Sequence, residues 1–215
     1  MSELESLRPR WDGPIIVAAP GPSLTEEVAE QCRGHHVICI KWAALRIPWA
    51  DVLYACNQWH WDEANGFPSF QGERWSCHHD RIDNKRAAAE RWGIRLVRGD
   101  RIAPHRFSTD PSVIYYGNCS GFQGLGFAVH WLRRPGRIVM VGYDFQGEGK
   151  NKYFLGEHPK GPSSGGKFVT YRPSFESAAK QLPEGIEIVN ATPGSALKCF
   201  PTAPLEEVLG GRKAA

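Results

Sequence analysis

The stretch that decides the fold is residues 116–145, YGNCSGFQGLGFAVHWLRRPGRIVMVGYDF. The chain just before it, at 112–116, has the β-branched and aromatic composition of a buried strand. Small residues at 117–121 then form a turn in which a ligand can approach the backbone. Residues 137–142 are a continuous apolar run, typical of a strand buried in a parallel sheet. Between turn and strand a helix is predicted, because apolar residues recur at helical spacing at Phe122, Leu125, Val129 and Leu132.

This strand, turn, helix and strand indicate both a fold class and a place for a ligand. Ser120 and Gln123 have capping-box spacing, which predicts Ser120 as the N-cap of the helix. Free backbone N–H groups at such a helix start bind anions, phosphate above all. We therefore expect an α/β protein with a Rossmann-like, mostly parallel sheet and helices on both faces. Residues 1–215 are expected to form a single domain.

A second turn of the same kind follows the first predicted strand, at residues 14–19. The turn is PGPSL at 20–24, and Ser23 with Glu26 again has capping-box spacing at the start of a helix. A first strand, tight turn and helix hold phosphate in nucleotide-binding folds. The turn is not a Walker loop, because it lacks the Gly-Lys-Ser/Thr ending, and it lacks the three-glycine dinucleotide fingerprint.

The remaining pattern places polar groups and a long loop around the same edge of the sheet. The third predicted strand ends at Asn57, whose amide can both donate and accept where open α/β sheets bind ligands. Residues 146–167 are dense in Gly, Lys, Ser and Pro, and we expect a partly ordered lid loop at about 146–170. Other segments are predicted as strands at 36–40, 49–56, 94–97 and 186–189, helices at 83–92 and 175–182, and loops at 64–80 and 98–111.

Composition restricts the class of protein without naming a ligand. The net charge of +3 permits an anionic ligand but does not demand nucleic acid. The 215 residues contain no signal peptide and no apolar run of about 18 residues, so we expect no membrane segment and a cytoplasmic location. No metal site is assigned, because standard zinc spacing is absent from Cys56, His60, Cys77, His78 and His79.

Five motifs in the same order along residues 14–207 resemble one family. They are IIVAAPGPSL at 15–24, the Cys119-Ser-Gly turn, VGYDF at 141–145, YFLGEH at 153–158 and TPGS at 192–195. Together they are similar to the sialyltransferase-like family, which includes bacterial lipooligosaccharide sialyltransferases, related flagellin-glycosylation proteins and hydroxymethylpterin pyrophosphokinases. The likeness is closer still to tailed-phage proteins that share WADVLYAC, GYDF, a His-Pro loop and PGSALxCFP.

The resemblance implies roles for the matching residues. His158 would be the general base on an acceptor hydroxyl, and Tyr153 would assist departure of the donor phosphate. The family has Tyr directly after the VGYDF-type loop, whereas this chain has Gln146. The residues that would hold the donor nucleotide are Gly21, Pro22, Ser23, Asn57, Asn118, Ser120, Gly121 and Asp144.

We therefore expect a glycosyltransferase that moves a sugar from a nucleotide-sugar donor to an acceptor hydroxyl, with no metal and no cofactor beyond the donor. Two alternatives stay open. One is ATP- and magnesium-dependent pyrophosphoryl transfer, in which Asp144 with Asp51 or Asp62 would hold the metal. The other is a non-catalytic accessory protein that binds nucleotide or nucleic acid through the Trp-rich segment 49–61.

The partners are expected only by class. The acceptor would be a glycan or, if the chain comes from a phage, a modified DNA base, and the location would then be the host cytoplasm. A homo-oligomer stays open as well.

Overall fold

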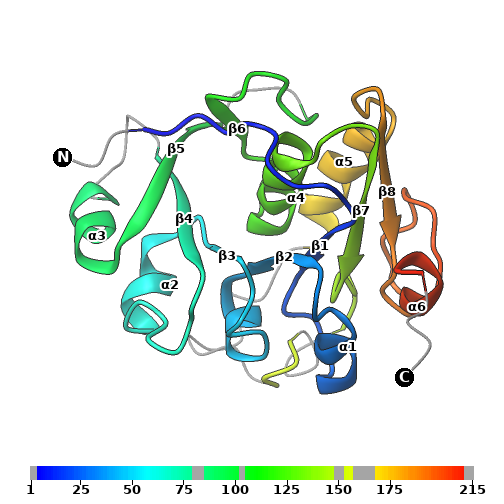
Figure 1. Ribbon diagram of the computed structural model, residues 1–215, viewed down its shortest axis with the longest axis horizontal. Helices are drawn as coiled ribbons and strands as arrows, with labels where there is room; N and C mark the ends of the chain where they lie inside the picture. The colour runs from blue at the N-terminus through cyan, green and yellow to red at the C-terminus, as the bar shows by residue number, and fades with distance from the viewer. Residues whose placement is uncertain (1–3, 79–84, 102–104, 148–152, 157–167, 211–215) are drawn as a thin grey trace.

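The computed structural model describes residues 4–78, 85–101, 105–147, 153–156 and 168–210 (Figure 1). Across these ranges a single sheet of eight strands, all parallel, has the order β6-β5-β4-β3-β2-β1-β7-β8. The strands are β1 (Ile15–Ala18), β2 (His36–Ile40), β3 (Val52–Tyr54), β4 (Glu73–His78), β5 (Ile94–Asp100), β6 (Val113–Tyr115), β7 (Gly136–Val141) and β8 (Ile186–Asn190). The predicted Rossmann-like α/β class is confirmed.

Helices cover both faces of this sheet, as the sequence predicted. They are α1 (Glu26–Gln31), the 3-10 helix η1 (Lys41–Leu45), α2 (Gln58–Glu63), α3 (Lys85–Trp92), α4 (Ser120–Trp131), α5 (Phe168–Ala179) and α6 (Leu205–Val208). Within the described ranges, no helix is both long enough and apolar enough to cross a membrane.

The two faces are built by the alternation of side chains along the strands. In β1, Ile15 and Val17 belong to one buried cluster, and Ile16 and Ala18 belong to the other. Helices α4 and α5 pack on the first cluster, whereas α1, η1, α2, α3 and α6 pack on the second (Figure 1). Because both faces are covered, β1 has no polar position, which explains its continuous apolar sequence.

The topology creates a crevice at one end of β1. The chain adds strands outward from β1 through β6, and α4 then carries it back so that β7 pairs with the other side of β1. The connections after β1 and β7 therefore leave in opposite directions. In open α/β sheets such a switch point, at the carboxyl ends of the strands, is where ligands bind.

One strand was missed by the sequence prediction. Residues 64–80 were expected to be loop, yet β4 pairs in parallel with β3 and β5. The strand begins with Glu73 and Arg74, whose charges hide the pattern. Arg74 is accommodated because its guanidinium donates to backbone carbonyls of the preceding turn, those of Gly66, Phe67 and Phe70.

Several element boundaries also differ from the prediction. Strand β5 continues through Asp100, where loop was expected from residue 98. Helix α5 begins at Phe168, inside the expected lid, and tolerates Pro173 within it. Of the expected lid, residues 148–152 and 157–167 lie outside the described ranges.

Candidate functional site

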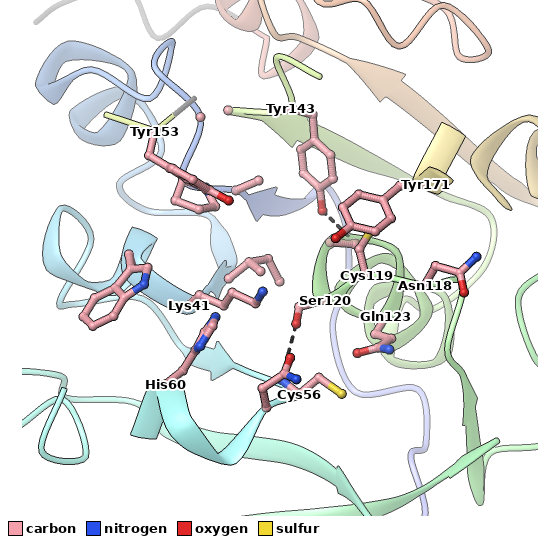
Figure 2. A pocket seen from close by; sticks show the side chains of 18 of the residues that line it. Lys41, Cys56, His60, Asn118, Cys119, Ser120, Gln123, Tyr143, Tyr153 and Tyr171 are labelled. Atoms are coloured by element: carbon pink, nitrogen blue, oxygen red, sulfur yellow. Dashed lines mark hydrogen bonds between the residues drawn. The ribbon is translucent and has the colours of Figure 1, made fainter. Parts of the chain in front are cut away.

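A cavity of about 550 Å³ lies at the switch point. Its walls come from the chain just after β1, β2, β3 and β7, from the N-terminus of α4 and from the start of α5 (Figure 2). This volume lies within the range of about 300–1,000 Å³ that small-molecule sites occupy. Of the residues predicted to bind a donor, those lining it are Gly21, Asn57, Asn118, Ser120, Gly121 and Asp144.

The turn after β1 is tied to the loop after β7. The Ser23 N–H donates to Asp144 Oδ1 at 3.2 Å, and the Ser23 hydroxyl donates to Oδ2 at 2.9 Å. The capping-box spacing predicted Ser23 as the N-cap of α1, and this prediction is wrong. The N-cap is Thr25, whose Oγ1 accepts from Val28 N–H at 3.2 Å. Neither Ser23 nor Pro22 is among the residues that line the cavity.

Only glycine fits where these two segments touch. The Gly21 N–H donates to Gly142 O at 3.1 Å. A Cβ on Gly21 would lie 1.9 Å from Asp144 Oδ2 and 2.3 Å from Gly142 O. The missing side chain at Gly21 thus lets the backbones after β1 and β7 approach closely at the floor of the cavity.

Asp144 is buried, with 8% of its surface exposed. Burial raises the pKa of this carboxyl, and the hydrogen bonds from Ser23 act in the opposite direction. Its main observed contacts are therefore structural, because the carboxylate holds the turn after β1 in place. One side of Asp144 still faces the cavity.

The N-terminus of α4 forms another wall. The N-cap is Cys119, not the predicted Ser120, and its Sγ accepts from Phe122 N–H at 3.4 Å. The Ser120 hydroxyl instead accepts from Cys56 N–H at 3.4 Å, which links α4 to the end of β3. Gln123 does not complete a capping box, because its amide donates to Tyr116 O at 2.8 Å.

The VGYDF motif connects the remaining walls. The Tyr143 hydroxyl donates to Gly121 O at 2.9 Å, joining the loop after β7 to α4 (Figure 2). The TPGS motif lies behind this loop: Thr192 Oγ1 accepts from Tyr143 N–H at 2.9 Å, and Ser195 donates to Tyr143 O at 2.6 Å. The TPGS turn thus supports the cavity wall, and none of its residues lines the cavity.

Two asparagines lie at the cavity with amides available to a ligand. Asn57 is the N-cap of α2, makes no side-chain cap hydrogen bond and is exposed. Asn118 has a left-handed φ of 65°, and its Nδ2 donates weakly, at 3.5 Å, to Ser174. Both positions match the sequence prediction of polar groups at this edge of the sheet.

Part of the expected lid lies over the cavity. Tyr153 lines it, and Phe154 N–H donates to Pro20 O at 3.1 Å, beside the turn after β1. Arg46 lies 4.3 Å over the Phe154 ring and fixes this segment further. His158, the predicted general base, lies outside the described residues.

The Trp residues of segment 49–61 lie in different environments. Trp61 is only 1% exposed, and its Nε1 donates to Ala55 O at 3.1 Å. Trp59 lines the cavity beside His60, with which it makes an edge contact. The segment therefore contributes to the core through Trp61 and to the cavity wall through Trp59.

The carboxylates proposed for magnesium are dispersed. Asp51 accepts from Val37 N–H at 2.7 Å, and Asp62 accepts from Trp92 Nε1 at 3.4 Å. Neither lines the cavity with Asp144. Within the part of the chain that the structure describes, no group of three or more His, Cys, Asp or Glu is placed to hold a metal ion.

Sequence reasoning missed several polar residues of the site, among them one lysine and one tyrosine. Lys41, the first residue of η1, and Tyr171 of α5 both line the cavity (Figure 2). Lys41 follows β2 as a lone basic residue beside a Trp, and Tyr171 lies between the expected lid loop and the helix expected at 175–182. The one signal for Lys41 in the sequence is its place directly after a buried strand, at the ligand-binding edge of the sheet.

Neither a protein-family model nor a curated protein sequence matches the chain. A proposal of function for this protein therefore depends on the geometry of the cavity and on the sequence motifs that surround it.

Proposed function

We propose that this protein is a glycosyltransferase that uses a nucleotide-sugar donor. The observation that carries the proposal is the convergence of the turn after β1, the N-terminus of α4 and the VGYDF loop on a single cavity. Each supplies backbone close to the ligand space, at the switch point where Rossmann-like folds hold nucleotides. The cavity is also large enough for a nucleotide.

In the proposed reaction the acceptor oxygen forms a bond to the anomeric carbon of the sugar. The bond between that carbon and the donor phosphate oxygen breaks, and its electron pair stays on the phosphate. The proton of the acceptor hydroxyl passes to a general base, for which we propose His158 on the basis of the YFLGEH motif. Tyr153, from the same motif, lines the cavity and is proposed to donate a hydrogen bond to the departing phosphate.

Donor binding is assigned to the residues that line the cavity. Asn57 and Asn118 offer amide groups for the base or sugar. The α4 N-terminus at Ser120 and Gly121 offers backbone N–H groups and a positive dipole end to the phosphate. Asp144 is proposed to act by positioning the turn after β1, because Ser23 occupies both of its oxygens.

Pyrophosphoryl transfer from ATP is the second candidate, and one observation favours it. Asp144 lines the cavity at the end of β7, a suitable place for a magnesium ligand. Donor turnover that survives a chelator would favour glycosyl transfer, whereas turnover only with ATP and magnesium would favour this candidate.

The test is turnover with a panel of nucleotide sugars, with and without a glycan or a hydroxylated DNA base as acceptor. We expect release of nucleotide from one donor class, and we expect His158→Ala to bind that donor while losing turnover. Full activity in His158→Ala would remove His158 from the site. Absence of turnover with every donor, together with ATP turnover, would overturn the glycosyltransferase assignment.

A further inference from the structure

Lys41 has an unusual backbone conformation at the end of β2. Its φ is 53°, in the left-handed region that residues other than glycine rarely adopt. Such conformations cost free energy and persist where the surroundings hold them, often at ligand sites. Figure 2 shows the result, with the amino group of Lys41 inside the cavity and pointing toward the N-terminus of α4.

The ammonium group has no partner in the described part of the chain. No hydrogen bond or ion pair joins Lys41 to another described residue, and the side chain keeps part of its surface open to the cavity. Burial lowers the pKa of Lys41, which reflects the cost of keeping an uncompensated charge there. A partly desolvated ammonium without a protein partner is available to pair with an anionic ligand in the cavity.

Little negative charge surrounds Lys41 among the described residues of the cavity. The thiols of Cys119 and Cys56 act on the pKa of Lys41, and burial raises the pKa of Cys119 to about 11, so this thiol is uncharged at neutral pH. The N-terminus of the 12-residue helix α4 adds partial positive charge. Asp144 is the only acidic residue among the described residues that line the cavity, and Ser23 holds its carboxylate.

We propose that Lys41 and the N-terminus of α4 form a phosphate subsite in this cavity. A phosphate group there would receive an ammonium donor from one side and backbone N–H groups from the other. Its oxygens would also pair a charge that the fold otherwise leaves unpaired.

A further role for Lys41 follows if the proposed glycosyl transfer is correct, and it rests on that function. When the sugar leaves, the electron pair of the broken bond adds negative charge to the phosphate oxygen. Lys41 is then the fixed cation that stabilises this charge, and it keeps its proton throughout the step. The chain would thus supply from the start of η1 the positive charge that many transferases take from a metal ion.

The first test uses inorganic pyrophosphate, because its binding does not depend on the base or sugar. Calorimetry would compare the wild type with Lys41→Met, which keeps the length of the side chain and removes its charge. Lys180→Met is the matched control. Lys180 is exposed and directly follows the C-terminal end of α5, whereas the cavity residues Phe168 and Tyr171 lie in the first turn of that helix. We expect Lys41→Met to weaken pyrophosphate binding at least about tenfold, and Lys180→Met to leave it within about twofold.

A second readout separates binding from a structural role. Lys41→Met is expected to melt no lower than the wild type, because it removes an unpaired charge, whereas loss of a structural contact would lower the melting temperature. Equal pyrophosphate affinity in wild type and Lys41→Met, or no pyrophosphate binding by the wild type, would overturn the subsite.

The subsite and the glycosyltransferase assignment can fail separately. Pyrophosphate binding that depends on Lys41, without turnover of any nucleotide sugar, would support the subsite and count against the transferase. Turnover with the same kcat in wild type and Lys41→Met would support the transferase and exclude Lys41 from its chemistry. If both hold, Lys41→Met should lower kcat by about 100-fold or more, a loss larger than its effect on KM.

Discussion

Ser23 and Asp144 stand 121 residues apart in the chain, yet Ser23 gives both its backbone N–H and its hydroxyl to the carboxylate of Asp144. These bonds join the turn after β1 to the loop after β7, the two segments that diverge at the switch point. Tyr143, next to Asp144, joins the same loop to α4 through Gly121. The shape of the cavity therefore depends on a small set of contacts between distant motifs.

The bond between Ser23 and Asp144 can be measured by a double-mutant cycle. Ser23→Ala should lower the free energy of unfolding by about 1 kcal/mol, because it removes one partly buried hydrogen bond. Asp144→Ala should lower it by about 1–2 kcal/mol, and the double variant should lose less than the sum. Denaturant unfolding gives the values. Strict additivity of the two single losses would show that the residues do not interact in solution.

Gly21→Ala tests the close approach of the two backbones. The new Cβ would overlap Asp144 Oδ2 and Gly142 O, so we expect a loss of about 2 kcal/mol or more in the free energy of unfolding. Gly126→Ala, in α4, is the matched control, because its Cβ would meet Ile114 Cδ1 at 3.4 Å, an ordinary contact. The control should be neutral or more stable, since Ala favours a helix over Gly. Similar losses in both variants would contradict the observed packing.

Lys41→Met should raise the stability of the ligand-free protein by about 1 kcal/mol. Lys41 lies in the cavity without a partner in the described ranges, and burial lowers its pKa, so the native state carries a charge that it solvates poorly. Thermal unfolding at neutral pH, compared with Lys180→Met, checks this expectation. A markedly less stable Lys41→Met would mean that the ammonium holds the fold together.

His130 makes stability depend on pH. It lies in α4 with 6% of its surface exposed, and burial, aided by the positive charge of Arg134, lowers its pKa to about 4. The folded state then binds fewer protons at this group than the unfolded state, whose His titrates near 6.5. The contribution of His130 is complete above pH 6.5 and falls progressively toward pH 4, by about 3 kcal/mol at most.

Denaturant unfolding between pH 7 and pH 4 would show this dependence. We expect His130→Gln, which cannot take up a proton, to flatten the pH dependence even if it changes the stability at pH 7. An equally steep loss of stability in both proteins would assign the effect to other groups.

Much of the fold could be predicted because strands buried on both faces leave a plain signal. The apolar runs of β1, β2 and β7, separated by small-residue turns and helices, indicate a parallel sheet and its ligand-binding edge. Strand β4 could not be found in this way. Its first residues, Glu73 and Arg74, are charged, and its place in the sheet is fixed by pairing with neighbours on both sides.

Several residues named from the sequence line the cavity, and the errors in the predicted caps share one cause. Ser23 and Ser120 have the spacing of N-caps, but tertiary hydrogen bonds with Asp144 and Cys56 place them otherwise. Lys41 belongs to no motif, and its entry into the cavity depends on a left-handed φ that local sequence does not reveal. Spacing along the chain thus located the turns, whereas the direction of individual side chains depended on contacts with distant residues.

The most direct test of the central claim is whether nucleotides bind in the switch-point cavity. Thermal unfolding would be measured for the wild type and for Asn57→Trp with a panel of nucleotides and nucleotide sugars. The new Trp side chain is expected to fill the cavity, and the exposed Asn57 makes no side-chain cap hydrogen bond that the substitution would remove. A ligand at 100 times its Kd stabilises the folded state by about 2.7 kcal/mol, a clear shift in Tm. We predict such a shift for one nucleotide class in the wild type and its loss in Asn57→Trp, whose own Tm stays unchanged. No shift with any nucleotide, or an equal shift in both proteins, would contradict the claim.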